Sequence, residues 1–304
     1  MKLATLRTPY GTTTVRVDGE GFGTELDHED VGALLASPDW RKAAEMSGEP
    51  ITFNPANLAP VIPNPGKIIC VGLNYAKHIR EMGHEAPNQP TLFIKFPDAL
   101  TGPYDDVYVP DYATSKLDYE GELCAVIGTR AYQVSSDEAL DYVAGYAVMN
   151  DYSMRDFQKA TSQFHAGKSF YRTAGFGPWL TTPDEWSPGR GARIRTQVDG
   201  ETRQDDNTDD LIFSVAELIE YCSRLYPLNP GDVIVTGTPE GVAAGMNPPR
   251  FIGDGQTVRI EIDGLGHLQA TTHYGQPDSV DHTNLLSNGG CCGGACGCSA
   301  ESRH

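Results

Sequence analysis

The segment Leu117–Gly128 reads LDYEGELCAVIG and places two glutamates, Glu120 and Glu122, directly ahead of an apolar run. The run CAVIG is typical of a strand that enters a hydrophobic core. Because residues two apart on a strand point to the same side, the two carboxylates converge on one point, with Gly121 behind them. Like charges at a buried strand end repel each other, so the arrangement requires a compensating positive charge.

A third acid, Asp151, ends the apolar strand predicted from YAVMND at residues 146–151. Three carboxylates at strand ends suit a hard divalent cation, and oxygen ligands favour Mg²⁺, Mn²⁺ or Ca²⁺ over zinc. A cation would relieve the mutual repulsion of the acids. The alternative is that the acids simply face water from the exposed side of a strand, and the spacing E-x-E alone does not decide between the two.

A histidine and a glutamate lie three residues apart in VGLNYAKHIREMG, residues 71–83. On a helical turn His78 and Glu81 are neighbours. A carboxylate beside an imidazole orients the ring and raises its basicity, which is how a base that activates water is built. Taken alone, the pair is better explained as an incidental ion pair on a surface helix.

Further polar residues follow in short segments of the chain. Arg155 and Gln158 stand in DYSMRDFQ, Lys168 stands in GKSF, and Thr238 stands in the glycine-punctuated turn VTGTPEGV. The backbone N–H groups of that turn and the Thr238 hydroxyl are suited to hold a carboxylate or a carbonyl. Each of these residues is, by itself, equally well explained as a solvated side chain or loop.

Composition excludes several classes of partner. The chain has 304 residues, of which 41 are acidic and 23 basic, for a formal charge of −18. So acidic a body repels phosphate backbones, and we expect no nucleic-acid partner. No run approaches the ~18 apolar residues of a membrane span, and MKLATLRTPYGTTTVRVDG lacks the apolar region of a secretory signal. Cys70, Cys124 and Cys222 stand singly in apolar contexts and predict buried thiols, hence a reducing cytoplasm.

The chain divides into three predicted regions. Residues 1–65 predict a small α+β unit, with a strand at 12–19 and helical periodicity over 28–46. Residues 66–278 predict a larger catalytic domain of short strands separated by Gly/Pro turns. Its predicted strands lie at 91–96, 106–110, 122–128, 146–151, 192–200, 232–237 and 257–264. Its predicted helices lie at 135–145 and 214–225.

Residues 279–304 predict a flexible tail rich in glycine and cysteine. The tail holds Cys291, Cys292, Cys296 and Cys298. One alternative is therefore a non-catalytic protein whose tail binds a soft metal such as Zn²⁺ or Cu(I) through thiolates. The segment lacks C-x-x-C spacing, so an unliganded tail is favoured.

Six segments together resemble the fumarylacetoacetate hydrolase family. They occur in the family's order over residues 66–275 and read GLNYAKHIREMG, LDYEGELCAVIG, GYAVMNDYSMRDFQ, GKSF, FGPWLTT and GDVIVTGTPEGV. The resemblance implies a mixed β/α+β fold, with a β-roll catalytic domain, a small N-terminal domain and a homodimer. It also implies Mg²⁺ or Mn²⁺ at Glu120, Glu122 and Asp151, and small anionic 2-oxo acids as substrates.

The resemblance also assigns roles to the other residues. It implies His78, Glu81 and Lys168 as catalytic residues, and we expect the substrate to be positioned by Arg155, Gln158, Thr238 and Tyr75. The expected reaction is hydrolysis of a C–C bond in an acylpyruvate, fumarylpyruvate or a diketo-deoxy sugar acid. The alternatives are decarboxylation or isomerisation of an unsaturated 2-oxo or 2-hydroxy dioic acid from aromatic degradation, or decarboxylation of oxaloacetate.

One region departs from the family's commonest form. A Trp often stands near the position of Phe164, and an Asp often follows the Gly-Lys pair, whereas here Phe170, Tyr171 and Arg172 follow it. We expect this region to line the substrate pocket and to bear on which acyl group fits. Arg172 either pairs with a second carboxylate of a diacid or merely offsets local acidity, and both interpretations stay open.

Overall fold

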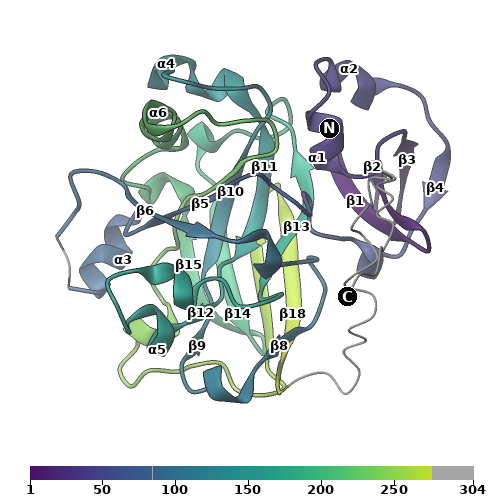
Figure 1. Cartoon of the computed structure of the whole chain (residues 1–304). Helices are drawn as coiled ribbons and strands as arrows, with labels where there is room; N and C mark the ends of the chain where they lie inside the picture. Colours follow the sequence, from purple (N-terminus) through teal and green to yellow (C-terminus); the bar gives the residue numbers. More distant parts are fainter. Residues whose placement is uncertain (84, 276–304) are drawn as a thin grey trace, which may run out of the picture.

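The computed structural model describes residues 1–83 and 85–275 of the 304 in the chain. The predicted tail at 279–304, with its four cysteines, lies outside these residues. Strands make up most of the regular secondary structure of the described chain, and the helices are few and short (Figure 1). No helix among the described residues has the length and apolar character needed to span a bilayer.

A large mixed sheet forms the framework, and among the described residues it has eleven strands. The N-terminal strands continue it, because β1 (Lys2–Thr8) pairs antiparallel with β13 (Ala174–Thr181). The other strands follow in the order β4 (Pro50–Thr52), β3 (Phe22–Leu26), β2 (Gly11–Gly19), β1, β13, β11 (Val143–Asn150), β10 (Gly121–Ile127), β16 (Val233–Val235), β5 (Ile68–Gly72) and β6 (Thr91–Lys95), with β7 (Leu100–Thr101) beside β13.

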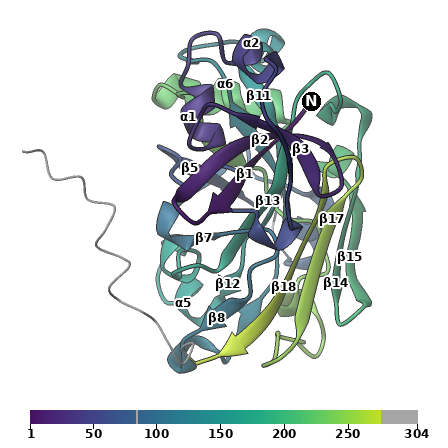
Figure 2. The same ribbon diagram turned by 90° about the vertical axis from the view of Figure 1, so that its right-hand side faces the viewer.

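A second sheet packs against the first. Its order is β15 (Glu201–Asn207), β14 (Arg193–Val198), β17 (Thr257–Ile262), β18 (Gly266–Tyr274) and β8 (Val107–Val109). Figure 2 shows β14, β15, β17 and β18 side by side along one edge of the molecule. A small ribbon joins β9 (Leu117–Asp118) to β12 (Ser153–Met154).

Six α-helices occur within the described residues, and α6 is the longest of them. They are α1 (Val31–Leu35), α2 (Trp40–Glu45), α3 (Ala76–Glu81), α4 (Ser136–Ala139), α5 (Arg155–Gln158) and α6 (Val215–Leu225). Short 3₁₀ helices occur in other connections of the described chain, at η1 (Pro55–Asn57), η2 (Pro97–Ala99), η3 (Asp111–Ala113), η4 (Leu140–Tyr142), η5 (Phe164–Gly167), η6 (Pro188–Arg190), η7 (Thr208–Asp210) and η8 (Ala243–Gly245).

The predicted helices are mostly shorter in the structure. Residues 28–46 form α1 and α2 rather than one helix, because SPD at residues 37–39 interrupts the hydrogen-bond ladder. The helix predicted at 135–145 ends early, since its apolar end already belongs to β11. Helix α6 matches its prediction and begins with a capping box of Ser214 and Glu217.

Strand β10 lies at the centre of the protein and is buried on both faces. Leu123 and Ile127 face a core shared with the second sheet, whereas Cys124 and Val126 face a core shared with α1 and α2. This alternation fixes the register of the strand, because a one-residue slip would exchange the two faces. Glu122 has the same parity as Cys124, so its side chain is also directed into the protein. Cys70, Cys124 and Cys222 are buried free thiols, as predicted.

Candidate active site

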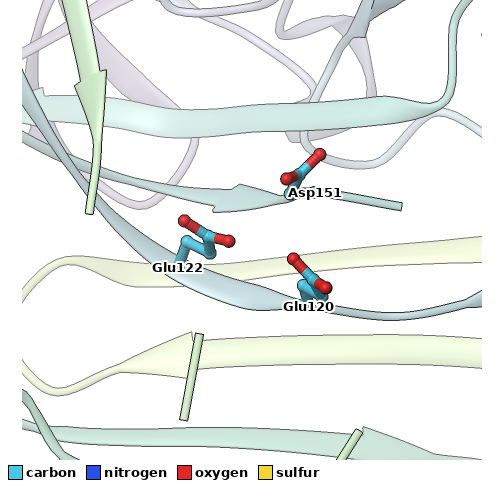
Figure 3. Close-up of side chains that lie close together, drawn as sticks. All are labelled: Glu120, Glu122 and Asp151. Atoms are coloured by element: carbon cyan, nitrogen blue, oxygen red, sulfur yellow. The ribbon is translucent and has the colours of Figure 1, made fainter. Parts of the chain in front are cut away.

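Three carboxylates meet where β10 begins and β11 ends. Glu120 precedes β10, Glu122 is its second residue and Asp151 follows β11. Antiparallel pairing aligns the two strand ends, and the Asp151 N–H donates to the Glu120 carbonyl at 2.9 Å. One oxygen from each carboxylate lies within 4.8 Å of the others, and all three side chains point toward one another (Figure 3). The structure therefore brings together the three acids predicted as metal ligands.

The glycine between the two glutamates is required by packing. A Cβ atom on Gly121 would lie 2.6 Å from Thr196 Oγ1 and 3.0 Å from Ile260 Cγ2, both on the second sheet. Real Cβ atoms do not approach other atoms to 2.6 Å, so a larger residue would push the sheets apart at the carboxylate cluster. The sequence E-G-E thus combines two inward-facing acids with a close contact between sheets.

Two buried lysines neutralise part of the cluster. Lys168 Nζ lies 2.5 Å from Glu120 Oε2 and 2.9 Å from Asp151 Oδ2. Lys95 Nζ lies 2.8 Å from Asp151 Oδ1 and also donates to the Lys168 carbonyl. Opposite charges raise the pKa of Lys168, although burial by itself would lower it. Lys168 therefore carries positive charge next to Asp151.

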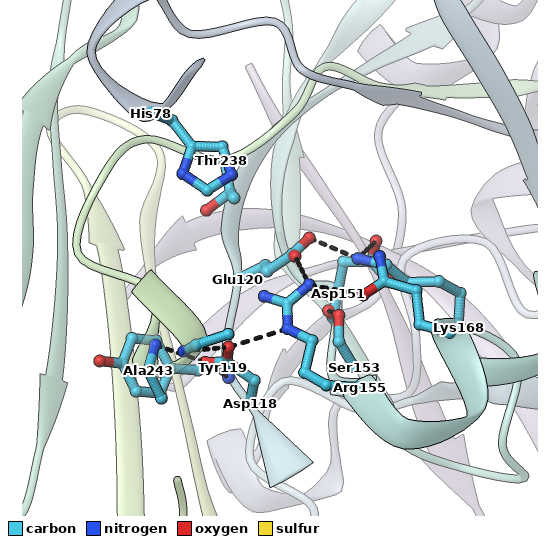
Figure 4. A network of polar contacts seen from close by, with 12 residues as sticks. His78, Asp118, Tyr119, Glu120, Asp151, Ser153, Arg155, Lys168, Thr238 and Ala243 are labelled. Carbon is cyan, nitrogen blue, oxygen red and sulfur yellow. Dashed lines mark hydrogen bonds and ion pairs between the residues drawn. The ribbon is translucent and has the colours of Figure 1, made fainter. Parts of the chain in front are cut away.

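Arg155 connects the cluster to a fourth buried acid. Its Nε lies 2.9 Å from Asp118 Oδ2, and its Nη1 lies 2.7 Å from Glu120 Oε1 and 3.0 Å from Gln158 Oε1 (Figure 4). Asp118 also accepts the N–H groups of Ala243 and Ala244 in η8. The remaining nitrogen, Arg155 Nη2, is buried and has no hydrogen-bond partner among the described residues. This donor is available to an anion in the pocket.

The two glutamates have opposite electrostatic surroundings. Burial alone would raise the pKa of Glu120, but Lys168 and Arg155 hold it below its usual value. Burial, followed by the charges of Asp151 and Glu120, raises the pKa of Glu122 well above its usual value. Glu122 accepts a hydrogen bond of 2.6 Å from the N–H of Gly237.

The donor set fits a divalent cation. Four buried carboxylates (Asp118, Glu120, Glu122 and Asp151) share three cations (Lys95, Arg155 and Lys168). One acid is therefore left without a compensating cation, and that acid is Glu122, which has no cation within 4.0 Å among the described residues. Hard carboxylate oxygens in such a cluster suit Mg²⁺, Mn²⁺ or Ca²⁺. Which ion binds stays a prediction.

The predicted histidine–glutamate pair forms on α3. His78 Nδ1 lies 3.0 Å from Glu81 Oε2, and because a carboxylate can only accept, Nδ1 carries the proton. In the neutral form of the ring, the second nitrogen, Nε2, is then left with a lone pair. His78 is largely buried and lines the same pocket as Glu120 and Glu122. The pair is therefore part of the site rather than an ion pair on an exposed surface.

One pocket of about 300 Å³ unites these groups. Its wall includes an apolar part formed by Phe93 and Phe164, whose rings pack edge to face at 5.8 Å. The predicted residues on its wall are His78, Glu120, Glu122, Arg155, Gln158, Lys168 and Thr238. Tyr75 is not among the wall residues, because its side chain is fully buried, and its hydroxyl has no partner within the described chain.

Thr238 is held in place by a residue of the second sheet. The Thr238 hydroxyl donates to the Gly121 carbonyl at 3.0 Å and accepts from Gln204 Nε2 at 2.8 Å. Gln204, in β15, also accepts from the Gly121 N–H and the Thr196 hydroxyl, and donates to the Pro239 carbonyl. Gln204 thus ties the backbone between the two glutamates to the loop that carries Thr238.

The expectation for residues 170–172 is wrong. Phe170, Tyr171 and Arg172 do not line the pocket, although Phe164 and Lys168 do. Phe170 instead packs edge to face on Phe157. Arg172 is half-exposed and lies 3.2 Å from Asp105, so it offsets local acidity rather than facing the site.

The chain can now be compared with known proteins. Residues 67–273 match the family model described as Fumarylacetoacetate (FAA) hydrolase C-terminal. The chain belongs to the fumarylacetoacetate hydrolase family. Its fold agrees, because the fumarylacetoacetate hydrolase of Exiguobacterium antarcticum superposes with a TM-score of 0.80 at 33% identity, covering 90% of this chain and 99% of that one. The mixed, sheet-rich fold expected from the sequence is confirmed.

Family members with different names are similar to this chain. The oxaloacetate tautomerase YisK of Bacillus subtilis is 41% identical over 235 residues, covering 76% of this chain and 78% of its own. The 5-carboxymethyl-2-hydroxymuconate delta-isomerase of Mycobacterium smegmatis is 31% identical, with a TM-score of 0.75, and covers 90% of this chain and 100% of its own. The family supports an enzyme and leaves hydrolysis, isomerisation and decarboxylation open as reaction types.

Proposed function

We propose that this protein is a metal-dependent enzyme that hydrolyses a C–C bond in a small 2-oxo acid with a second carbonyl, a β-diketo acid. The observation that carries the proposal is that His78, of the His78–Glu81 pair, lines one pocket together with Glu120 and Glu122 of the carboxylate cluster. A water-activating base thus lies beside a site for a divalent cation, and hydrolysis requires both. When bound, such a cation supplies Lewis acidity and a template for the oxygens of the 2-oxo acid.

Arg155 and Gln158 are proposed to orient the substrate. Arg155 is fixed by Asp118 and Glu120, and its Nη2 has no hydrogen-bond partner among the described residues. A substrate carboxylate or carbonyl oxygen satisfies that donor. Because the guanidinium is already held on two sides, little side-chain entropy is lost when the substrate binds.

The proton transfers follow from the geometry of His78. The unprotonated ring nitrogen takes a proton from water, while Glu81 stabilises the imidazolium that forms. The hydroxide adds to the distal carbonyl, and the bond between that carbon and C3 of the 2-oxo acid breaks. The electron pair of the broken bond stays on the 2-oxo fragment as an enolate, close to the Lys168 ammonium. The proton held by His78 then returns to that fragment.

Keto–enol tautomerisation of a 2-oxo acid is a second candidate. It is favoured by the 41% identity to a protein named oxaloacetate tautomerase. The same residues are sufficient, since His78 would move a proton between carbon and oxygen without adding water. Decarboxylation and double-bond migration use the same enolate. What separates these reactions is whether water enters the product.

Product analysis with Mg²⁺ distinguishes the candidates. The protein is supplied with acetylpyruvate, fumarylpyruvate, a diketo-deoxy sugar acid and oxaloacetate, each with and without EDTA. Pyruvate or another 2-oxo fragment together with a free carboxylic acid, lost in EDTA and in Glu120→Gln, supports the hydrolase. Enol–keto conversion of oxaloacetate without cleavage of any β-diketo acid would replace the hydrolase by the tautomerase. The cytoplasmic location and the homodimer stay predictions.

A further inference from the structure

A lysine on the wall of the active-site pocket has no carboxylate partner among the described residues. Lys159 directly follows α5, the helix that carries Arg155 and Gln158, and lines the pocket with them. Its side chain is exposed, in contrast to the buried acids on the same wall. No carboxylate oxygen of the described residues lies within 4.0 Å of the Lys159 ammonium nitrogen, the distance that defines an ion pair. In a protein with a net charge of −18, an unpaired cation inside an active-site pocket calls for an explanation.

The other cations of the pocket already form ion pairs with buried carboxylates. Lys168 is paired with Glu120 and Asp151, and Arg155 is paired with Asp118 and Glu120. Arg155 keeps one nitrogen, Nη2, without a partner among the described residues, and the proposed function assigns it to the first carboxylate or the carbonyl of the substrate. Lys159 is then the described cation on the pocket wall that pairs with no carboxylate and that the proposed function does not use.

The cation that the sequence suggested as a partner for a second substrate carboxylate already has a partner within the protein. Arg172 is paired with Asp105 and lies outside the pocket wall. Phe93 and Phe164 contribute an apolar part to the pocket that suits a short carbon chain. The pocket therefore combines a buried polar cluster, an apolar wall and one exposed cation.

We propose that Lys159 binds a second carboxylate of the substrate and thereby selects 2-oxo dicarboxylic acids over 2-oxo acids with a single carboxylate. This inference rests on the proposed function, because the first carboxylate and the 2-oxo group are assigned to the buried cluster. An acid with one carboxylate would leave Lys159 without a partner. Lys159 is thus a specificity-determining residue, whereas His78 and Lys168 serve the reaction common to both substrate types.

The test measures binding rather than turnover. 2-Oxoglutarate and 2-oxopentanoate each have five carbons and one 2-oxo acid end, and they differ in that only the former has a terminal carboxylate. Neither contains a second carbonyl to be hydrolysed. We expect calorimetry with saturating Mg²⁺ to give about fivefold tighter binding of 2-oxoglutarate, the value of one ion pair near solvent.

Substitutions of Lys159 then assign the preference to this residue. Lys159→Gln should reduce it to less than twofold without weakening 2-oxopentanoate, Lys159→Arg should keep it, and Lys159→Glu should reverse it. Lys42→Gln, at an exposed lysine of α2, is the matched control and should bind both ligands like the unaltered protein.

Two results would overturn the assignment, and they differ from failure of the proposed function. Equal binding of both keto acids by the unaltered protein, or a preference that survives Lys159→Gln, removes the role of Lys159 and leaves the 2-oxo acid site intact. Binding of neither keto acid in the presence of Mg²⁺ removes the proposed function and the role of Lys159 with it.

Discussion

Gly241 donates its backbone N–H to the carboxylate of Glu81, with the nitrogen 3.1 Å from Oε1 and 3.2 Å from Oε2. The same loop begins at Gly237, whose N–H donates to Glu122. A single loop after β16 therefore touches both the acid that orients the histidine and an acid of the metal-ligand cluster. Gly245 closes the loop against Glu81, because a Cβ there would lie 2.6 Å from Glu81 Cδ. The position of Glu81 is thus set by backbone on two sides.

This geometry makes Glu81→Gln a sharp test of the histidine–glutamate pair. The amide oxygen still accepts from Gly241, but the negative charge that stabilises a protonated His78 is lost. We expect kcat to fall about 100-fold, with KM within about threefold and an unchanged unfolding curve. Glu45→Gln, at an exposed position of α2, is the control. An unchanged kcat would show that Glu81 does not support a base.

The acid cluster could be predicted because strand periodicity is a local property. Residues two apart on a strand share a face, so Glu120 and Glu122 had to converge, and an acid at the end of another strand was a natural third member. The position of Asp151 relative to them depends on the pairing of β10 with β11, which was not predicted; the resemblance to the family implied only that Asp151 is the third ligand. Lys95 was missed, because a single lysine after the apolar run TLFI also fits a strand end that reaches water.

Other residues of the site could not be predicted from local patterns. Asp118 stands in the segment that identified the site, yet its partners in η8 are about 125 residues away in the sequence. Gln204 lies in ETRQDDN, a polar run that lacks the apolar alternation of a strand, and β15 was missed for the same reason. Long-range hydrogen bonds decide these positions, and periodicity carries no information about them.

Metal binding should depend on Glu122. The charge of this buried acid is the one left uncompensated, so Glu122→Gln should weaken Mg²⁺ binding by about 100-fold or more. The metal-free variant should be at least as stable as the metal-free parent, because a neutral amide removes the repulsion from Asp151 and Glu120. Calorimetric Mg²⁺ titration and thermal unfolding in EDTA measure the two effects. Unaltered Mg²⁺ affinity would place the cation elsewhere.

The N-terminal strands are fastened to the rest of the protein by an acid-sensitive contact. Arg7 in β1 pairs with Asp105 through two nitrogens, at 2.9 Å and 2.5 Å, and Thr101 donates to the same carboxylate at 2.7 Å. Burial opposes ionisation of Asp105, but the bonds from Arg7 and Thr101 hold its pKa below its usual value. The contact therefore stabilises the fold above the unfolded-state pKa of 3.8, and that stability is lost as the pH falls through the lower folded-state value.

Asp105→Asn should accordingly be a pH-dependent substitution. At pH 7 we expect a loss of about 1–2 kcal/mol, since a charge-assisted pair is replaced by a neutral one. Below the unfolded-state pKa of 3.8 the parent protein begins to lose the same contribution, so the difference between the two proteins should shrink as the pH falls further. Urea unfolding at pH 7, at pH 5 and at about pH 2.5, below the unfolded-state pKa, measures it. A difference that stays constant over this range would mean that the Asp105 carboxylate does not contribute through its charge.

Gln204 provides the test of how the second sheet supports the site. Its buried amide accepts from the Gly121 N–H and donates to Thr238, so Gln204→Leu leaves polar groups on both sides of the cluster without partners. We expect a loss of about 2–3 kcal/mol in urea unfolding and weaker Mg²⁺ binding, because Gly121 stands between the two glutamates. Gln197→Leu, at a half-buried position of neighbouring β14, should change stability by less than about 0.5 kcal/mol. Stability loss with unaltered Mg²⁺ affinity would limit Gln204 to a structural role.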